Sequence, residues 1–560
     1  MKIKDFFYAV LLAIVSLLLV SDLFFNAGRQ LTFDGAIHMT TMAQFARALS
    51  AGDFPVVWTT GFANYGFPLS LFAHQVTAYG GGILVLLTND PVLSYTLLFA
   101  FSAIISTLLM YVFFRLSFGE DASLAGAFLF NFAPYRILNI YARGALPEFF
   151  SSCFVPVILM GLFFAFKKRN IFGVFLISTG MALLTLTHPM MALVNTVVIL
   201  PYFLFLLLPV QNWRYALRDV GIFSFACALG LLMTSYYTLP LSYELRFFYQ
   251  GVGNKNHLAP NSYLGMQNFF TPETWTYFYQ NQVGMRGQFF QVGIFETAII
   301  IAGSLGSCFL FWKRKHINIA NIFLCIGAVA VFLTLSASAF LYTHLHILGE
   351  LQFPWRFLSA FILVPPVLLA YLIENTSHKR LFVFLSLLVI CILRFPQLYG
   401  KNFFVAPHDS YFFTPFNLHS TNLNTIWTGE TENYPVKKQQ TDIIAGTGHI
   451  VSQNVSNSWR EYRIEAATPL RMVDYTFYFP GWKVWVDQQP VSLEFQDVEY
   501  RGVMTYRIPQ GSHDVRIRFE DTKIRFFSKI LTVIGVAIFT VSLLIILKRK
   551  TIRGYELFSK

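Results

Sequence analysis

Charged residues are scarce in this sequence. Asp, Glu, Lys and Arg make up only 12% of its 560 residues, whereas soluble domains carry roughly 25%. Hydrophobic residues account for 55%, and the mean hydropathy is +0.54. Apolar runs of about 20 residues, enough for an α-helix to cross a bilayer, recur along the chain. This composition excludes an ordinary soluble protein and predicts a polytopic integral membrane protein.

Cysteine is scarce as well. The five cysteines all fall within predicted membrane spans, where we expect small buried side chains: Cys153, Cys227, Cys308, Cys325 and Cys391. This placement leaves no disulfide framework and no zinc-type spacing. The net charge of +12 comes from short basic clusters between apolar runs. Membrane topology explains such clusters, so nucleic acid is not an expected partner.

The basic clusters predict the orientation of the chain, because such clusters stay in the cytoplasm. Twelve spans place every cluster inside, together with both termini: 6–24, 91–114, 121–135, 147–166, 171–187, 190–209, 219–240, 292–311, 317–338, 355–373, 380–396 and 527–547. The first run lacks the cleavage site of a signal peptide, so we expect an uncleaved span. The expected location is the plasma membrane, with the active face outside the cytoplasm.

Residues 66–88 are apolar enough to span but are excluded from this count. Counting them would place Arg115 and Lys167–Arg169 outside. The segment also carries His74 and three successive glycines, Gly80–Gly82. We therefore predict a juxtamembrane segment on the outer face. The alternative is that another short span is wrongly assigned.

Composition divides the chain into three parts. After residue 396 the apolar runs give way to alternating patterns, such as Lys483–Asp487, separated by turn residues. This alternation is typical of a β-sandwich. The expected fold is an α-helical membrane domain over 1–396, with about 12 spans, a long first outer loop (25–90) and a second outer loop (241–291). An extracytoplasmic β-sandwich (397–526) and a final membrane helix with a basic cytoplasmic tail (527–560) complete it.

Asp34 and His38 are the first candidate site residues. They follow the first span, and their spacing places both on one face of a helix that begins there. A carboxylate at the outer surface can act as a general base on a membrane-bound substrate. His38 could orient this carboxylate, bind a phosphate or join it in a metal site. The alternatives are a helix N-cap for Asp34 and a structural hydrogen bond for His38.

Three further basic residues, and two residues next to them in the motifs, are candidate site residues. Arg143 lies with Glu148 in a short outer loop, and a guanidinium matches phosphate oxygens. Pairing of Arg143 with Glu148 is the structural alternative. Trp355 and Arg356 lie at the outer end of a predicted span. Positive charge is disfavoured on the outer side of a membrane, and phosphate binding would explain the presence of Arg356 there. An aromatic belt and a snorkelling anchor are the alternatives there. His188, between two spans, is a weaker candidate that could simply cap a helix.

Together these features resemble the GT-C superfamily of membrane glycosyltransferases. The resemblance rests on Asp34, on Gly52-Asp53-Phe54-Pro55 and Tyr65-Gly66-Phe67-Pro68 of the first outer loop, and on a juxtamembrane helix before the second span. The chain is also similar to YfhO-like proteins and to the membrane family labelled "6-pyruvoyl-tetrahydropterin synthase-related". That likeness lies in Arg143–Glu148, Phe353–Arg356 and the Phe479–Asp487 strand pair. The label implies no pterin chemistry here, because no histidine-based zinc site is present in the sequence.

The resemblance implies transfer of a sugar from a polyprenyl-phosphate donor to a glycan, lipid or protein acceptor of the cell envelope. It implies that Asp34 is the general base and that Arg143 and Arg356 stabilise the leaving phosphate. Substrate binding would also involve His38, Asp53, Glu148, His188 and Trp355. Some relatives use a divalent metal, which Asp34 and His38 could ligate. The β domain would bind the acceptor or cover the site; its Trp482 and Trp485 could stack on sugars or pack in its core.

Two other functional classes remain open. A transporter or flippase of lipid-linked glycans would also be polytopic and carry outer arginines. It would, however, place ionisable groups near the bilayer midplane on interrupted helices. A non-catalytic membrane assembly factor would tolerate loss of Asp34. The acids outside the β domain cluster at the outer edge of the predicted spans, and this favours an enzyme.

Overall fold

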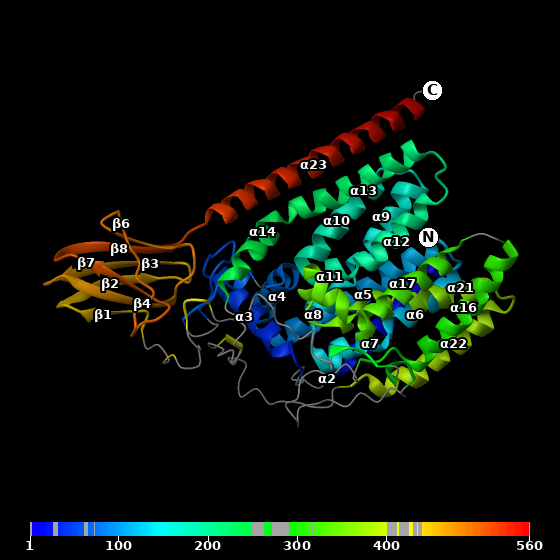
Figure 1. Cartoon of the computed structure of the whole chain (residues 1–560), viewed down its shortest axis with the longest axis horizontal. Coiled ribbons are helices and arrows are strands. Elements are labelled where there is room, and N and C mark those ends of the chain that lie inside the picture. The colour runs from blue at the N-terminus through cyan, green and yellow to red at the C-terminus, as the bar shows by residue number, and fades with distance from the viewer. Residues whose placement is uncertain are drawn as a thin grey trace.

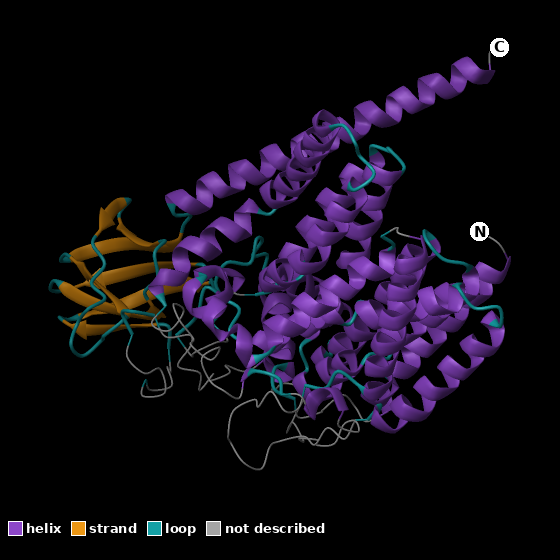
Figure 2. Cartoon of the chain, turned by 45° about the vertical axis from the view of Figure 1, so that its right-hand side comes forward, coloured by secondary structure: helices purple, strands orange, loops and turns teal. Residues whose placement is uncertain are grey.

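A helical domain and a β domain make up the protein, and the last helix, α23 (Lys523–Phe558), joins them (Figure 1). The structure described is a computed structural model. The structure describes residues 3–25, 32–60, 65–71, 73–248, 262–265, 267–270, 290–314, 317–399, 412–413, 425–428, 434 and 439–558. Figure 2 shows the strands gathered at one end of the molecule. Most of the predicted second outer loop lies outside the described residues.

Every predicted span coincides with a helix. These helices are α1 (Ile3–Leu19), α5 (Pro91–Arg115), α6 (Glu120–Asn131), α9 (Phe154–Leu162), α10 (Phe172–Thr187), α12 (Thr196–Leu207), α13 (Trp213–Met233), α16 (Ile294–Arg314), α17 (Ile319–Thr334), α21 (Val364–Glu374), α22 (Lys379–Arg394) and α23. Within the described residues, seven helical stretches are long and apolar enough to cross a membrane, and four more apolar helices are shorter. The several apolar helices are thus confirmed, and the count of twelve crossings stays a prediction.

Further helical elements connect these helices and shape their ends. They are α2 (Ser21–Phe25), α3 (Gly35–Ser50), η1 (Leu69–Leu71), α4 (Gln75–Thr88), α7 (Pro134–Leu138), η2 (Asn139–Arg143), α8 (Leu146–Ser151), η3 (Phe163–Lys167), α11 (Pro189–Val194), α14 (Ser235–Glu244), η4 (Leu245–Phe247), α15 (Gln267–Phe270), η8 (Ser336–Ser338), α18 (Ala339–His344), α19 (His346–Gly349), η9 (Pro354–Phe357), α20 (Leu358–Phe361) and η10 (Phe395–Gln397). Two of them, η2 and η3, are π-helical turns.

Ion pairs join several basic clusters at one end of the helical domain. Lys4 on α1 contacts Asp121 on α6 at 2.6 Å. Arg115 at the end of α5 contacts Asp5 on α1 at 2.8 Å. Glu374 at the end of α21 accepts a hydrogen bond from the backbone of Gly119, just before α6. Lys4 and Arg115, which were predicted to share one side of the membrane, therefore lie at the same end of the helical domain.

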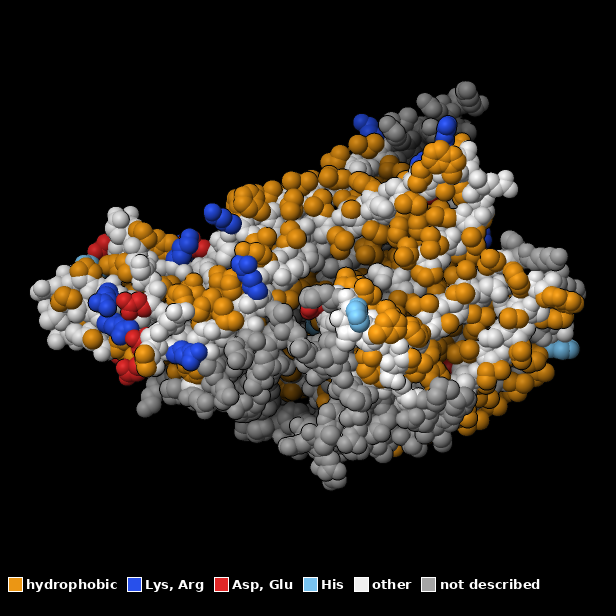
Figure 3. Space-filling model, in the orientation of Figure 1, with side chains coloured by type: hydrophobic (Ala, Val, Ile, Leu, Met, Phe, Trp, Pro, Cys, Tyr) orange, Lys and Arg blue, Asp and Glu red, His pale blue; other side chains and the backbone are white. Residues whose placement is uncertain are grey.

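Side chains on the molecular surface fit a membrane protein. On the face shown in Figure 3, hydrophobic side chains cover much of the helical domain, whereas charged side chains gather on the β domain and near the helix ends. Cys153 is buried, as expected, but Cys308 and Cys325 are exposed. The expectation of burial was wrong for these two because α16 and α17 place them on the surface of the molecule. A cysteine side chain is apolar enough to face lipid.

The segment predicted to lie beside the membrane forms α4, which packs closely along α3. A Cβ on Gly81 would lie 2.0 Å from the Met42 sulfur, and one on Gly82 would lie 2.9 Å from the Phe45 Cβ. Two of the successive glycines therefore let the helices approach, as small residues do between membrane helices. The position of α4 relative to the bilayer stays a prediction.

The β domain consists of two antiparallel sheets. Its strands are β1 (Thr441–Ala445), β2 (Gly448–Val455), β3 (Trp459–Ala466), β4 (Leu470–Phe477), β5 (Trp482–Val486), β6 (Gln489–Val491), β7 (Val503–Ile508) and β8 (Gly511–Phe519). They are ordered β1-β4-β7 and β2-β3-β8-β5-β6. Alternate side chains of both sheets, such as Ile464 on β3 and Tyr506 on β7, pack in one apolar core. Alternating hydrophobicity predicted this C-terminal sheet region correctly.

The first outer loop shares the core of the β domain. Trp58 packs against Trp482 with ring centroids 5.1 Å apart, and against Phe519 at 5.2 Å. The backbone N–H of Phe477 donates to the carbonyl of Tyr65 at 3.0 Å. Trp482 is 3% exposed, which agrees with core packing rather than sugar stacking. The loop that carries Asp34 is thus fixed against the β domain.

Candidate functional site

Asp34 stands at the N-cap position of α3, but its side chain makes no capping hydrogen bond. The Thr32 Oγ1 accepts the Gly35 N–H instead, at 3.1 Å. The Asp34 side chain is half-buried, and within the described residues nothing hydrogen-bonds or ion-pairs with its carboxylate. Capping therefore does not explain this acid. His38 follows one turn later, and its N–H donates to the Asp34 carbonyl at 3.1 Å.

The backbone holds Asp34 against the loop that carries Arg143. The Asp34 N–H donates to the Arg143 carbonyl at 2.8 Å, and the Phe33 N–H donates to the Ala142 carbonyl at 3.3 Å. Gly144 follows with φ +64°, where a Cβ would lie 2.2 Å from Thr32 Oγ1. Only glycine fits this close approach in a left-handed conformation. Arg143 ends a π-helical turn, a feature that is frequent at functional sites.

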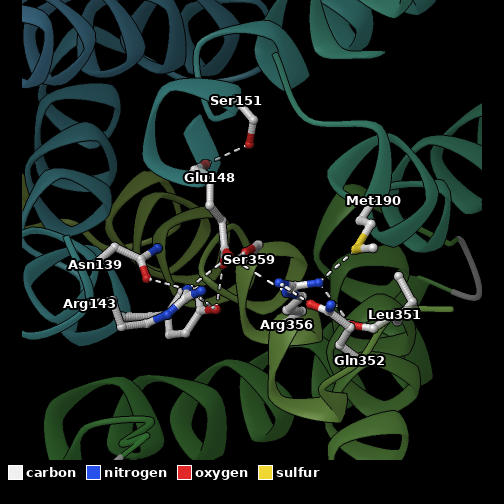
Figure 4. A network of polar contacts seen from close by, with 10 residues as sticks. Asn139, Arg143, Glu148, Ser151, Met190, Leu351, Gln352, Arg356 and Ser359 are labelled. Atoms are coloured by element: carbon white, nitrogen blue, oxygen red, sulfur yellow. Dashed lines mark hydrogen bonds and ion pairs between the residues drawn. The ribbon is translucent and has the colours of Figure 1, made fainter. Parts of the chain in front are cut away.

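Glu148 lies between two arginines, as Figure 4 shows. Its carboxylate is 2.8 Å from Arg143 Nη1 and 4.0 Å from Arg356 Nε. Tyr135 Oη and Ser359 Oγ also donate to it, at 2.5 Å and 3.0 Å. Elements α7, η2, α8, η9 and α20 thus meet at one carboxylate. The predicted pairing of Arg143 with Glu148 is present, but it belongs to a larger network.

Both arginines are buried and oriented by further acceptors. Arg143 is 3% exposed and Arg356 is 8% exposed. Arg143 Nη1 also donates to Asn139 Oδ1 at 2.8 Å. Arg356 donates to the Leu351 carbonyl at 2.9 Å and to Gln352 Oε1 at 3.1 Å. Burial overturns the alternative of a snorkelling anchor for Arg356, because such a side chain would reach water.

Three histidines from separate elements lie next to this network. The rings of His38 and His74 have centroids 6.2 Å apart, and His74 stacks on His188 at 4.4 Å. All three lie outside the predicted spans. Burial, with the positive charge of Arg143, lowers the pKa of His38 to about 3. Burial, with His38 and Arg356, lowers the pKa of His74 to about 3. Both imidazoles are therefore neutral near pH 7.

The charges of the network shift the pKa of Asp34, although the Asp34 carboxylate forms no hydrogen bond or ion pair with these groups in the described residues. Burial raises the pKa of Asp34, the positive charges of Arg143 and Arg356 lower it, and Glu148 raises it; the net shift is upward. A carboxylate with a raised pKa is a better proton acceptor. Among the residues that the structure describes, no group of three or more His, Cys, Asp or Glu side chains is placed to hold a metal ion. A metal site that includes Asp34 and His38 stays a prediction.

Two predicted site residues lie elsewhere. Asp53 accepts hydrogen bonds from the β-domain residues Ser456, Asn457 and Ser458, so it ties the first outer loop to that domain. Trp355 is 0% exposed and stacks on Phe290 and Phe353, with centroids 4.3 Å and 4.0 Å away. Trp355 is therefore packed among aromatic rings, and its role in substrate binding stays a prediction. The aromatic-belt alternative also fails, because a belt residue faces the membrane surface.

Several residues of the cluster were absent from the predicted site: His74, Tyr135, Asn139, Gln352 and Ser359. Helical spacing could have found some of them. Asn139 precedes Arg143 by four residues, and Gln352 precedes Arg356 by four. Ser359 follows Arg356 by three. The sequence indicated His74 only weakly as a site residue, because its one unusual feature is a polar side chain at the start of an apolar helix.

Comparison with known proteins shows the family. The model of a family described as "6-pyruvoyl-tetrahydropterin synthase related domain; membrane protein" matches residues 78–399, more than half of the chain. The chain belongs to this family of membrane proteins. The matched range includes Arg143, Glu148, His188 and Arg356, whereas Asp34 and the β domain lie outside it. The predicted similarity to the family labelled "6-pyruvoyl-tetrahydropterin synthase-related" is thereby confirmed.

Two individual proteins are similar to this family member. An uncharacterized protein of Lactococcus lactis subsp. cremoris (strain MG1363) is 21% identical over 318 residues, which are 56% of this chain and 50% of that protein. The chain thus spans about half the length of this curated relative. The apo crystal structure of the Archaeoglobus fulgidus oligosaccharyltransferase aligns with a TM-score of 0.39 at 13% identity, over 75% of this chain and 61% of that chain. A likeness of this size carries no argument about function.

Proposed function

We propose that this family member is a membrane glycosyltransferase of the GT-C type. It transfers a sugar from a polyprenyl-phosphate donor to a glycan, lipid or protein acceptor of the cell envelope, at the extracytoplasmic face of the plasma membrane. One observation carries the proposal: the half-buried Asp34 carboxylate, which has no hydrogen-bond partner among the described residues, is held by its backbone beside two buried arginines. Such a site offers a proton acceptor and an anion-binding surface together.

The proposed reaction is a single displacement. Asp34 accepts the proton of an acceptor hydroxyl, whose oxygen then forms a bond to the anomeric carbon of the sugar. The bond from that carbon to the phosphate oxygen breaks, and the phosphate leaves with the electron pair. Arg143 and Arg356 stabilise the charge that develops on this phosphate. Attack opposite the leaving group inverts the configuration of the sugar.

Glu148 has a different role from Asp34 in this proposal. Three donors already engage the Glu148 carboxylate, namely Arg143, Tyr135 and Ser359, and Arg356 forms an ion pair with it at 4.0 Å. A carboxylate in this state is a poor base, because accepting a proton would break the network. Glu148 therefore orients both guanidinium groups towards a ligand. The neutral His74 and His188 rings each have an Nδ1 atom without a partner in the described residues, and we assign them to polar contacts with the substrate.

In this proposal the β domain positions the acceptor. It shares its core with the first outer loop, so it can position an acceptor relative to Asp34. A metal ligated by Asp34 and His38 stays a prediction, and no step of the proposed reaction uses one. Transfer measured with and without EDTA tests it.

Binding of a polyprenyl phosphate to the full chain in nanodiscs tests the proposed anion site. Arg356→Gln removes a guanidinium, and a hydrogen bond to a charged group contributes about 1.5–3 kcal/mol. We expect Kd to rise about 10-fold to 100-fold. Arg246→Gln is the matched control, since Arg246 is an exposed arginine after α14. Equal affinity of wild type and Arg356→Gln, or equal weakening by both substitutions, would contradict the proposal.

A further inference from the structure

Arg136 differs from every other buried arginine of the described residues, because it has no carboxylate partner. Six arginines are buried: Arg136, Arg143, Arg356, Arg394, Arg460 and Arg525. Five of them lie within 4.0 Å of a carboxylate, as Arg143–Glu148, Arg356–Glu148, Arg394–Glu296, Arg460–Asp474 and Arg525–Glu244. A buried charge is costly unless it is paired, and the chain observes this rule at all its other buried arginines.

Only neutral groups surround the Arg136 guanidinium. Its Nη1 donates to Ser152 Oγ at 2.7 Å, and its Nη2 donates to Ser106 Oγ at 2.9 Å. The rings of Phe130 and Phe149 lie 4.4 Å and 4.2 Å from its central carbon. These contacts orient the guanidinium but do not neutralise it. Its Nε has no partner among the described residues.

A small cavity of about 20 Å³ adjoins Arg136. Its walls include Phe130, Phe149, Asn139, Asn195 and Glu148. Asn139 directs its carbonyl oxygen to Arg143, which leaves its amide N–H groups as donors. A volume of this size holds a water molecule or an ion of similar size, and it is too small for a phosphate group.

The charges around the cavity leave a positive excess. Arg136, Arg143 and Arg356 carry three positive charges, and Glu148 with ionised Asp34 carries two negative ones. One further negative charge would balance the group. We propose that this cavity binds a small monovalent anion of the size of chloride, held by Arg136 and Asn139. The anion neutralises Arg136, so that Arg143 and Arg356 remain available to a larger ligand.

Anion-dependent stability of the purified full chain tests this site. The Tm is measured in detergent against chloride, bromide and gluconate at matched ionic strength. We expect a saturable rise in Tm with chloride and bromide but not with gluconate, because gluconate cannot enter the cavity. Arg136→Met should abolish the rise. Arg394→Met, at a buried arginine paired with Glu296, should lower Tm in every salt but keep the chloride response.

If Arg136→Met does not fold, a second variant and a direct measurement still test the anion site. Val155 lines the cavity, and Val155→Leu adds a methylene there while keeping Arg136; it should also abolish the chloride response. Crystals grown in bromide should show an anomalous peak beside Arg136. Identical Tm values in chloride and gluconate, a chloride response that persists in Arg136→Met, or a water without anomalous signal would each overturn the proposal. None of these readouts depends on sugar transfer.

Discussion

The backbone N–H of Asp34 donates a 2.8 Å hydrogen bond to the carbonyl oxygen of Arg143. This bond joins the start of α3 to the end of η2, far apart in the sequence. It fixes the two residues relative to each other without using either side chain. The Asp34 carboxylate is therefore left without a partner in the described residues, while the Arg143 guanidinium is directed to Glu148.

Gly144→Ala should disturb the candidate site beyond its effect on the backbone. An alanine at φ +64° costs about 1 kcal/mol, and its Cβ would also lie 2.2 Å from Thr32 Oγ1. Gly52→Ala is the matched control, since Gly52 has φ +82° and nothing within 4 Å of the added Cβ. We expect both variants to lose similar backbone stability, and only Gly144→Ala to lose ligand binding as well. Equal binding by the two variants would show that the Thr32 contact is unimportant.

Glu148→Gln should destabilise the folded protein strongly. The substitution leaves Arg143 and Arg356 buried without a carboxylate, and removing one partner of a buried ion pair costs about 3–5 kcal/mol. Glu494→Gln is the control, because Glu494 forms ion pairs with Arg471 and Arg507 near the surface of the β domain. Surface pairs contribute about 0–1 kcal/mol. Unfolding of both variants in detergent measures the difference, and a small effect of Glu148→Gln would remove its central role.

Asp34→Asn should stabilise the protein at neutral pH. The pKa of Asp34 is raised by burial despite the positive charges nearby, so the folded state holds the proton more tightly than the unfolded state. The stability from this group is present at low pH and is lost as the pH rises through the folded pKa. We therefore expect a higher Tm for Asp34→Asn at pH 7, and a gain that shrinks towards the ordinary Asp pKa of about 4. A lower Tm at pH 7 would assign Asp34 a structural role.

Ser50 and Lys168 should lie on opposite sides of the membrane. Both residues are exposed, and the predicted topology places Ser50 in the first outer loop and Lys168 in the cytoplasm. Ser50→Cys and Lys168→Cys are introduced into a variant without the five native cysteines and treated with an impermeant maleimide in intact cells. We expect only Ser50→Cys to react, and Lys168→Cys to react after permeabilisation. Reaction of both in intact cells would mean that α4 crosses the membrane.

The fold could be predicted largely from periodicity. Apolar runs indicate membrane helices because a bilayer demands them, and the alternation in segments such as Lys483–Asp487 indicates strands. The surface exposure of Cys308 and Cys325 could not be predicted, because membrane helices are apolar on both faces. The number of crossings also depends on short helices such as α4, for which hydropathy alone does not decide.

The site could be predicted only in part. Arg143 and Glu148 are five residues apart, so their contact follows from sequence spacing. The proximity of His38, His74 and His188 depends on how α3, α4 and α11 pack, which no local pattern reveals. Asp53 and Trp355, which matched family motifs, make interface and packing contacts that the motifs did not indicate, and their roles in substrate binding stay predictions. The sequence did not indicate Arg136 as a site residue, because its lack of an acid partner is visible only in three dimensions.

Sugar transfer by Asp34→Asn membranes tests the central claim most directly. The assay supplies labelled lipid-linked sugars and compares wild type, Asp34→Asn and Asp53→Asn at matched expression. Asp53 is the control because it is an acid of the same loop that binds the β domain. General base catalysis contributes about 10²-fold to 10⁴-fold, so Asp34→Asn should lose at least about 100-fold while Asp53→Asn retains transfer. Undiminished transfer by Asp34→Asn would contradict the account.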